Sequence, residues 1–189
     1  MNIPKMPAAA MQRRLKAHLK RGGLAAYPTE SCYGLGCLPT HAQALRRLIR
    51  LKKRPQHKGM IVIGADLPQL LPLLKRPSEN TQTMLDQAWP AAKTFLLPAA
   101  GNVLPALRGK GRSKLAVRVP LHHGARALCH ILKTPLVSTS CNCAGKRACK
   151  TEREVRRQFG GKVMIIGGRT LGQKAPSMII DGETGRRLR

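Results

Sequence analysis

The chain has 189 residues, of which 42% are hydrophobic and only 3% aromatic, so we expect one domain with a core of aliphatic side chains. Glycine and proline (18 and 14) are scattered along the chain, so this composition excludes disordered, collagen-like and coiled-coil chains. Lysine and arginine number 35 against 8 aspartates and glutamates, which gives a net charge of +27. No apolar run approaches the roughly 20 residues of a transmembrane helix, and no export signal is evident. We therefore expect a cytoplasmic protein without membrane contact, whose six cysteines are free thiols.

The first elements follow from hydrophobic periodicity and capping residues. Residues 6–21 carry apolar side chains at helical spacing, and Leu24–Tyr27 is a short buried run that predicts a strand. Thr40 and Gln43 form a capping-box pattern, which predicts the start of a helix that reaches Leu51. This part of the chain therefore predicts a helix, a strand and a second helix.

The middle of the chain is also predicted to alternate between strands and helices. Met60–Ile63 is predicted as a buried strand, and a helix is predicted near residues 123–132. Asp66 and Ser78 are predicted as N-caps of two further helices, the second of which ends at Trp89.

A further helix is predicted to start at a second capping box, Thr151 with Glu154, and to end at Gly160. The other strands are predicted at five short apolar runs, which are Thr94–Leu97, Leu115–Val119, Leu136–Thr139, Val163–Ile166 and Met178–Ile180. Several links between strands are too short for a helical crossover, so parallel and antiparallel neighbours should be mixed. We predict a single α/β domain over residues 1–189, with a mixed sheet and flanking helices.

The few acidic residues limit the chemistry. Five of the carboxylates lie at predicted caps or on helix faces, and only Glu30 and Asp181 lie at strand–loop junctions. Hydrolysis by paired carboxylates and catalysis by two metal ions both need clustered acids, so the sequence favours neither. Glu30 has two interpretations, an ion pair with a lysine or arginine and a contact to a Mg²⁺-bound phosphate. The cysteine spacings fit no zinc pattern, so no structural metal is expected.

Two segments carry polar groups where α/β folds bind ligands. Lys52-Lys53-Arg54-Pro55 stands at the end of a predicted helix, where the helix dipole favours cations. Ser138-Thr139-Ser140-Cys141-Asn142 follows an apolar strand and would place hydrogen-bonding side chains at a sheet edge, although a simple turn would also use them. Gly34-Leu35-Gly36 lacks the third glycine of a dinucleotide motif, and no P-loop motif occurs.

Taken in order, these segments resemble the YrdC/TsaC family of threonylcarbamoyl-AMP synthases. The resemblance covers essentially the whole chain in its short, single-domain form. The matching segments are Tyr27-Pro28-Thr29-Glu30-Ser31-Cys32-Tyr33-Gly34-Leu35-Gly36, Lys52-Lys53-Arg54-Pro55, Leu115-Ala116-Val117-Arg118-Val119, Ser138-Thr139-Ser140-Cys141-Asn142, and Pro176-Ser177 through Asp181.

The resemblance implies a nucleotidyltransferase that joins L-threonine, bicarbonate and ATP into threonylcarbamoyl-AMP and releases pyrophosphate, the first step of the t6A modification of tRNA. It also implies a twisted mixed sheet around a large basic cavity, Mg²⁺ that arrives with ATP, and a downstream threonylcarbamoyl transferase as partner. Every reactant is an anion, which suits a site with many cations and few acids.

The resemblance also implies roles for ten residues of this sequence. The implied catalytic and ATP-binding residues are Lys52 and Arg54 on the phosphates, with Ser140 and Asn142 at the reacting centre. Arg118 would grip the threonine carboxylate with its planar fork, and Arg189 would approach the nucleotide. The residues that would line the threonine pocket are Thr29, Ser31, Thr139 and Ser177.

The sequence departs from the family at two places. The family's W-P-G-P-x-T appears as Trp89-Pro90-Ala91-Ala92-Lys93-Thr94, where alanine tolerates positive φ poorly. The family's S-T-S-A-N-x-S-G appears as Ser138-Thr139-Ser140-Cys141-Asn142-Cys143-Ala144-Gly145, so a small residue and a hydroxyl of the family pattern are replaced. These changes leave the K-x-R and S-x-N residues intact, so activity is still expected.

Two other hypotheses stay open. The net charge of +27 also fits a basic module that binds tRNA or double-stranded RNA and has weak or no synthase activity, although a charged surface alone does not require such contact. The few aromatic side chains would limit such binding to phosphate contacts. A third hypothesis is transfer of a carbamoyl group to another substrate, as in larger carbamoyltransferases that share part of this domain.

Overall fold

The computed structural model describes residues 9–55 and 57–189. Its longer helices are α1 (Ala9–Lys20), α2 (Ala42–Lys52), α4 (Glu79–Ala88), α6 (His123–Leu132) and α7 (Glu152–Phe159), and its single-turn helices are α3 (Leu67–Leu70) and α5 (Pro105–Arg108). The strands are β1 (Ala25–Pro28), β2 (Tyr33–Gly36), β3 (Ile61–Ile63), β4 (Lys93–Pro98), β5 (Lys114–Arg118), β6 (Leu136–Ser140), β7 (Met164–Ile165) and β8 (Met178–Asp181).

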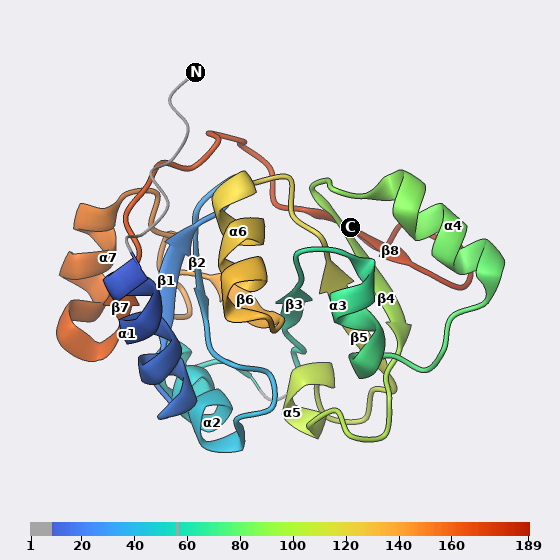
Figure 1. Ribbon diagram of the computed structural model, residues 1–189, viewed down its shortest axis with the longest axis horizontal. Coiled ribbons are helices and arrows are strands. Elements are labelled where there is room, and N and C mark those ends of the chain that lie inside the picture. Colours follow the sequence, from blue (N-terminus) through green and yellow to red (C-terminus); the bar gives the residue numbers. More distant parts are fainter. Residues whose placement is uncertain (1–8, 56) are drawn as a thin grey trace.

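The strands form one sheet in the order β7-β1-β2-β6-β3-β5-β4-β8 (Figure 1). Three neighbouring pairs are parallel, β1 with β7, β3 with β5 and β4 with β8, and the other pairs are antiparallel. The prediction of a mixed sheet in an α/β fold is therefore confirmed.

Successive side chains of a strand point to opposite faces of the sheet, so the buried contacts of β1 show which helices cover each face. On β1, Ala25 and Tyr27 belong to the buried cluster that also contains residues of α1 and α6, whereas Ala26 belongs to the larger cluster that contains residues of α2 and α7. Helices therefore cover both faces of β1. In Figure 1, α6 crosses the middle of the sheet, while β4 and β8 lie to one side of it.

Among the described residues, no helix packs over one face of β5 and its neighbours. Leu115 and Val117 of β5 are buried in the larger core, but Lys114, Ala116 and Arg118 alternate with them and line two pockets. The site therefore lies on the part of the α6-side face that the helices leave open.

Most predicted helix starts are confirmed, and one is wrong. Asp66 accepts from Gln69 N at 2.9 Å, Ser78 accepts from Thr81 N, and the Thr151 capping box is present. The N-cap of α2 is His41 instead of Thr40, because the His41 imidazole accepts from Ala44 N at 3.3 Å. Helix α1 is described from Ala9, so residues 6–8 of that prediction lie outside the described residues.

Strand β2 was not predicted, because two of its four residues are glycines. A Cβ on Gly36 would stand 1.7 Å from the Val137 carbonyl oxygen, so glycine is required where β2 approaches β6. The Gly-x-Gly pattern thus serves strand packing. Helix α5 was also not predicted, since one turn carries too little periodicity.

All six cysteines are free, as predicted. Within residues 9–55 and 57–189, no group of three or more His, Cys, Asp and Glu side chains is arranged to hold a metal ion. No helix in this part of the chain is long and apolar enough to span a membrane.

Candidate active site

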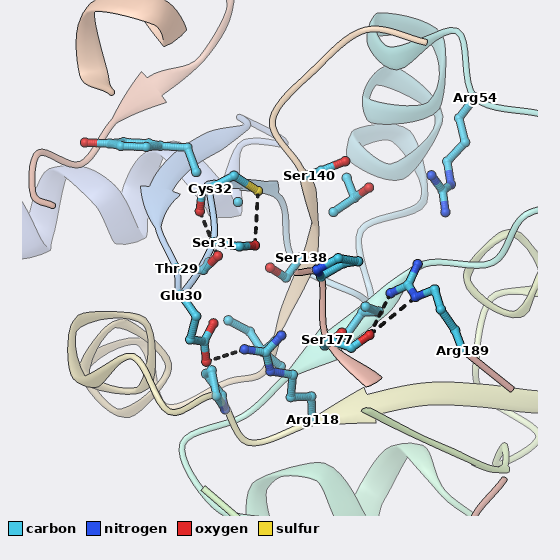
Figure 2. A pocket seen from close by; sticks show the side chains of 17 residues that line it. Thr29, Glu30, Ser31, Cys32, Arg54, Arg118, Ser138, Ser140, Ser177 and Arg189 are labelled. Atoms are coloured by element: carbon cyan, nitrogen blue, oxygen red, sulfur yellow. Dashed lines mark hydrogen bonds and ion pairs between the residues drawn. The ribbon is translucent and has the colours of Figure 1, made fainter. Parts of the chain in front are cut away.

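A pocket of about 220 Å³ lies on the open face of the sheet (Figure 2). It is lined by three arginines, Arg54, Arg118 and Arg189, and by one carboxylate, Glu30. Hydroxyl groups supply most of the remaining polar lining, and Figure 2 shows Ser31, Ser138, Ser140 and Ser177 around the space between the arginines. The pocket therefore favours an anionic ligand that also offers hydrogen-bonding groups.

Strand register brings two of these serines together. Ser138 and Ser140 are two residues apart on β6, so their side chains point to the same face. Their cross-strand partners are Ile61 of β3 and Gly34 of β2, which also line the pocket. The sheet itself therefore forms the floor of the pocket.

A tight turn between β1 and β2 forms one wall. The Thr29 hydroxyl donates to the Cys32 carbonyl oxygen at 2.7 Å, and Thr29 N donates to the same oxygen at 3.0 Å. Backbone bonds to the carbonyls of Thr29 and Glu30 come from Leu171 and Gln173, so the segment that precedes β8 fastens this turn. Burial raises the pKa of the Cys32 thiol, so this pocket residue is a neutral group and not a thiolate nucleophile.

Arg118, at the end of β5, forms an ion pair with Glu30 (Figure 2). Both side chains are largely buried, with 11% and 2% of their surfaces exposed. Burial raises the pKa of Glu30, but the Arg118 charge and hydrogen bonds outweigh burial, and the pKa lies below its usual value. Glu30 is therefore a carboxylate at neutral pH, and the ion-pair interpretation is confirmed.

Ser177 is held from two sides. Its hydroxyl lies 3.0 Å from the hydroxyl of Thr94, which is fully buried on β4. Its carbonyl oxygen accepts from Arg189 Nη2 at 3.0 Å and from Nε at 3.3 Å. Since Arg189 and Ser177 both line the pocket, this contact joins two of the predicted site residues.

Lys52 and Asn142 lie behind the pocket wall. The Lys52 ammonium donates to the carbonyl oxygens of Ser140 and Asn142, the latter at 2.7 Å, and to Asn142 Oδ1 at 3.4 Å. The Ser140 hydroxyl donates to Asn142 Oδ1 at 2.6 Å. Burial lowers the pKa of Lys52 to about 8, and the Arg54 charge adds to this effect. The Lys52 ammonium thus faces protein oxygens in this structure, and its contact with phosphate stays a prediction.

Arg54 connects this pocket to a second one. Its guanidinium donates to the carbonyl oxygens of Lys58 and Gly59, at 3.1 and 2.5 Å. The second pocket, of about 480 Å³, shares Arg54, Ile61 and Arg189 with the first and has a largely aliphatic floor with further arginines at its rim. The two pockets therefore meet at a pair of arginines.

The structure brings most predicted site residues together. The members that line the first pocket are Thr29, Ser31, Arg54, Arg118, Thr139, Ser140, Ser177 and Arg189, and those outside it are Lys52 and Asn142. Sequence reasoning did not assign Ser138 or Thr94 to the site. The alternation of β6 could have identified Ser138 from Ser140, but nothing local indicates that Thr94 reaches Ser177.

The two alanines of the altered turn before β4 do not adopt positive φ. Positive φ among the described non-glycine residues occurs only at Lys53 and Lys133, so Ala91 and Ala92 are not strained there. Ala91 N donates to the Val119 carbonyl oxygen at 3.1 Å, which ties the turn to the end of β5.

Comparisons with known proteins identify relatives of this chain. The family model Sua5_yciO_yrdC, described as telomere recombination, matches residues 17–189. A Neisseria meningitidis serogroup A protein named threonylcarbamoyl-AMP synthase is 70% identical over 100% of both chains. A Chromobacterium violaceum protein of the same name is 49% identical over 99% of this chain and 96% of its own length. The crystal structure of P. abyssi Sua5 complexed with L-threonine is 30% identical with a TM-score of 0.85, and the match covers 96% of this chain but 53% of that one.

Proposed function

Because this chain belongs to the Sua5/YciO/YrdC family, we propose that the pocket on its open sheet face is where L-threonine and ATP react. The chain is an enzyme that synthesises threonylcarbamoyl-AMP, the intermediate of t6A formation, and ATP and L-threonine are its substrates. Formation of this product from L-threonine, bicarbonate and ATP releases pyrophosphate and water.

One observation carries the assignment of the pocket, namely that it gathers three arginines and several hydroxyls around a space with a single carboxylate. Attack of a threonine carbamate on the α-phosphorus of ATP, with pyrophosphate leaving, needs anions held together and developing charge stabilised. The arginines supply that stabilisation without a protein nucleophile.

We propose that threonine occupies the end of the pocket near Arg118. The Arg118 guanidinium would bind the carboxylate, since its planar fork matches a carboxylate better than a lysine would. The hydroxyls available to the threonine side chain and amino group at this end belong to Thr29, Ser31, Thr139 and Ser177.

We propose that ATP enters from the second pocket. Its aliphatic floor suits the adenosine, and Arg54 and Arg189 stand where the two pockets join, so they would bind the phosphates. The α-phosphorus would then lie near Ser140, on the path from adenosine to threonine. Lys52 and Asn142 would act from behind by fixing Ser140.

Mg²⁺ would accompany ATP as a complex with its phosphates. Glu30 is the only carboxylate among the described residues that line the pocket, and its charge is already paired with Arg118. Magnesium commonly keeps several waters and takes substrate phosphates as ligands, which fits a site that offers it few protein oxygens.

The test is pyrophosphate release from ATP, with L-threonine and bicarbonate each omitted in turn. Release that requires all three supports the proposal, and an Arg54→Ala variant should raise the KM for ATP at least tenfold. A folded protein that releases pyrophosphate equally well without threonine, or an Arg54→Ala variant with unchanged kinetics, would contradict it.

The charge of +27 favours a second candidate, contact with tRNA phosphates on the surface outside the pocket. Such contact would bring the synthase close to the downstream threonylcarbamoyl transferase and its substrate. Binding of unmodified tRNA should weaken at least tenfold between 50 and about 200 mM salt, and affinity that is insensitive to salt would argue against it.

A further inference from the structure

Glu30 occupies an unusual place for a carboxylate. It lines a pocket built for anions, is 2% exposed, and is ion-paired with the arginine proposed to bind the substrate carboxylate. A buried ion pair is by itself weak evidence for stability, because desolvation offsets its attraction. The position of Glu30 therefore calls for a role beyond holding the fold together.

The Glu30 side chain is fixed from more than one direction. Oε1 accepts from Leu121 N at 2.6 Å and from His122 N at 3.2 Å, the two backbone amides that immediately precede α6. The positive end of the α6 dipole also favours a negative charge here. Glu30 is therefore a rigid anchor that joins the β1–β2 turn, the start of α6 and the end of β5.

The anchor engages only one edge of the Arg118 guanidinium. Nη2 forms the ion pair with Glu30 Oε1, but neither Nη2 nor Nε makes a hydrogen bond among the described residues, and Glu30 Oε2 is likewise buried without a hydrogen-bond partner there. Figure 2 shows Glu30 on the side of Arg118 away from Ser177 and Arg189, so the guanidinium lies between its anchor and these two residues.

We propose that Glu30 is the positioning and selectivity residue for Arg118, and this inference rests on the proposed function of Arg118 as the threonine carboxylate clamp. A free arginine has many rotamers, and holding one edge presents the remaining donors to the ligand in a fixed direction.

The Glu30 charge also decides which anions Arg118 accepts. An uncompensated arginine beside Arg54 and Arg189 would attract phosphate and sulfate, which compete for the same space. With Glu30 beside it, Arg118 has little net charge to attract a multiply charged anion. The Glu30 charge weakens the binding of a zwitterionic amino acid less, because such a ligand carries a positive group together with its carboxylate.

The decisive variant is Glu30→Gln, which keeps the shape and the acceptor for the two backbone amides but removes the charge. Product formation is followed by mass spectrometry at varied threonine, ATP and sodium sulfate. We expect the KM for threonine to rise at least tenfold and the KM for ATP to change less than twofold. Sulfate should compete with threonine at concentrations at least tenfold lower than for the wild type.

Matched variants separate this role from a structural one. Glu152→Gln removes the same charge from an exposed ion pair on α7, with Arg156, and should leave every constant unchanged. Glu30→Asp keeps the charge at a shorter reach, so it should raise the threonine KM to an intermediate value without new sulfate sensitivity. If Glu30→Gln fails to fold, Glu30→Asp is the deciding variant, because a wild-type threonine KM in the Glu30→Asp protein would overturn the proposal.

A double variant tests whether Glu30 acts through Arg118. Adding Glu30→Gln to Arg118→Lys should change the threonine KM less than twofold, and additive effects would overturn the proposal. A folded Glu30→Gln protein with wild-type threonine KM and sulfate sensitivity would do the same. Failure of the proposed function looks different, because the wild type would then release pyrophosphate equally well without threonine, or Arg118→Lys alone would leave the threonine KM unchanged.

Discussion

Replacing Thr94 by valine should weaken threonine binding, although Thr94 does not line the pocket. Its hydroxyl lies 3.0 Å from that of Ser177, and Thr94 itself is fully buried. Valine has the same shape, so the change removes one hydrogen bond and leaves no cavity. Such a bond contributes about 1 kcal/mol, and the Ser177 hydroxyl, which borders the pocket, is then free to turn.

If the whole 1 kcal/mol appears in substrate binding, the KM for threonine rises about fivefold. The same loss in the fold lowers the melting temperature by about 2–4 °C. The assay is product formation at varied threonine, together with thermal unfolding. Thr83→Val is the matched control, because the Thr83 hydroxyl bonds the Glu79 carbonyl oxygen on the exposed side of α4. An unchanged threonine KM in folded Thr94→Val, alongside a raised one in Ser177→Ala, would refute this role of Thr94.

Three further predictions follow from close packing and charge. Gly36→Ala places a Cβ 1.7 Å from the Val137 carbonyl oxygen, so the free energy of unfolding measured in urea should fall by about 3 kcal/mol or more. The control is Gly101→Ala, whose Cβ would meet nothing within 4 Å and which should leave the free energy of unfolding unchanged. The pKa of Glu30 is lowered from 4.5, so the stability that the Glu30 charge contributes is present above about pH 4.5 and is lost as the pH falls through the folded-state pKa. The difference in unfolding free energy between wild type and Glu30→Gln should therefore shrink in acid. A difference that is constant from pH 7 to 3 would contradict this. The Lys52 pKa of about 8 predicts that the reaction rate falls as the pH rises through 8, because the deprotonated amine has one N–H fewer to donate to the Ser140 carbonyl oxygen at the end of β6. The Lys52→Arg protein should keep its rate to higher pH. An identical fall in rate at alkaline pH in both proteins would exclude Lys52 as its cause.

The fold was predictable where the signals are local. Asp66, Ser78 and Thr151 cap helices within three residues of themselves, so the sequence displays both partners of each bond. His41 was missed as a cap because an imidazole performs that role less often than the hydroxyl beside it in the sequence. Strand β2 was missed because its glycines are explained only by the approach of β6, which is far away along the chain.

The site was predictable in its membership but not in its orientation. Motif resemblance identified residues that line the pocket because they cluster at strand ends, where short segments carry several polar groups. The inward turn of Lys52 toward Ser140 and the pairing of Glu30 with Arg118 both depend on how separate elements meet. Sequence spacing does not show which side chains from distant elements come into contact, so these contacts could be identified only from the three-dimensional structure.

The place of β8 at the edge of the sheet has a consequence for the motions of the enzyme. This strand has one neighbouring strand, β4, and Ser177 precedes it while Arg189 follows it (Figure 1). On its other side it is bonded to residues 186–189, through the bridge of Ile180 with Arg187 and through backbone hydrogen bonds of Ile179 and Asp181. Local opening of an edge strand costs less than global unfolding, so hydrogen exchange should be faster in β8 than in the central β6. Such opening would release Arg189 from the nucleotide side and Ser177 from the threonine side, while Arg118 and Glu30, anchored on β5 and α6, stayed in place.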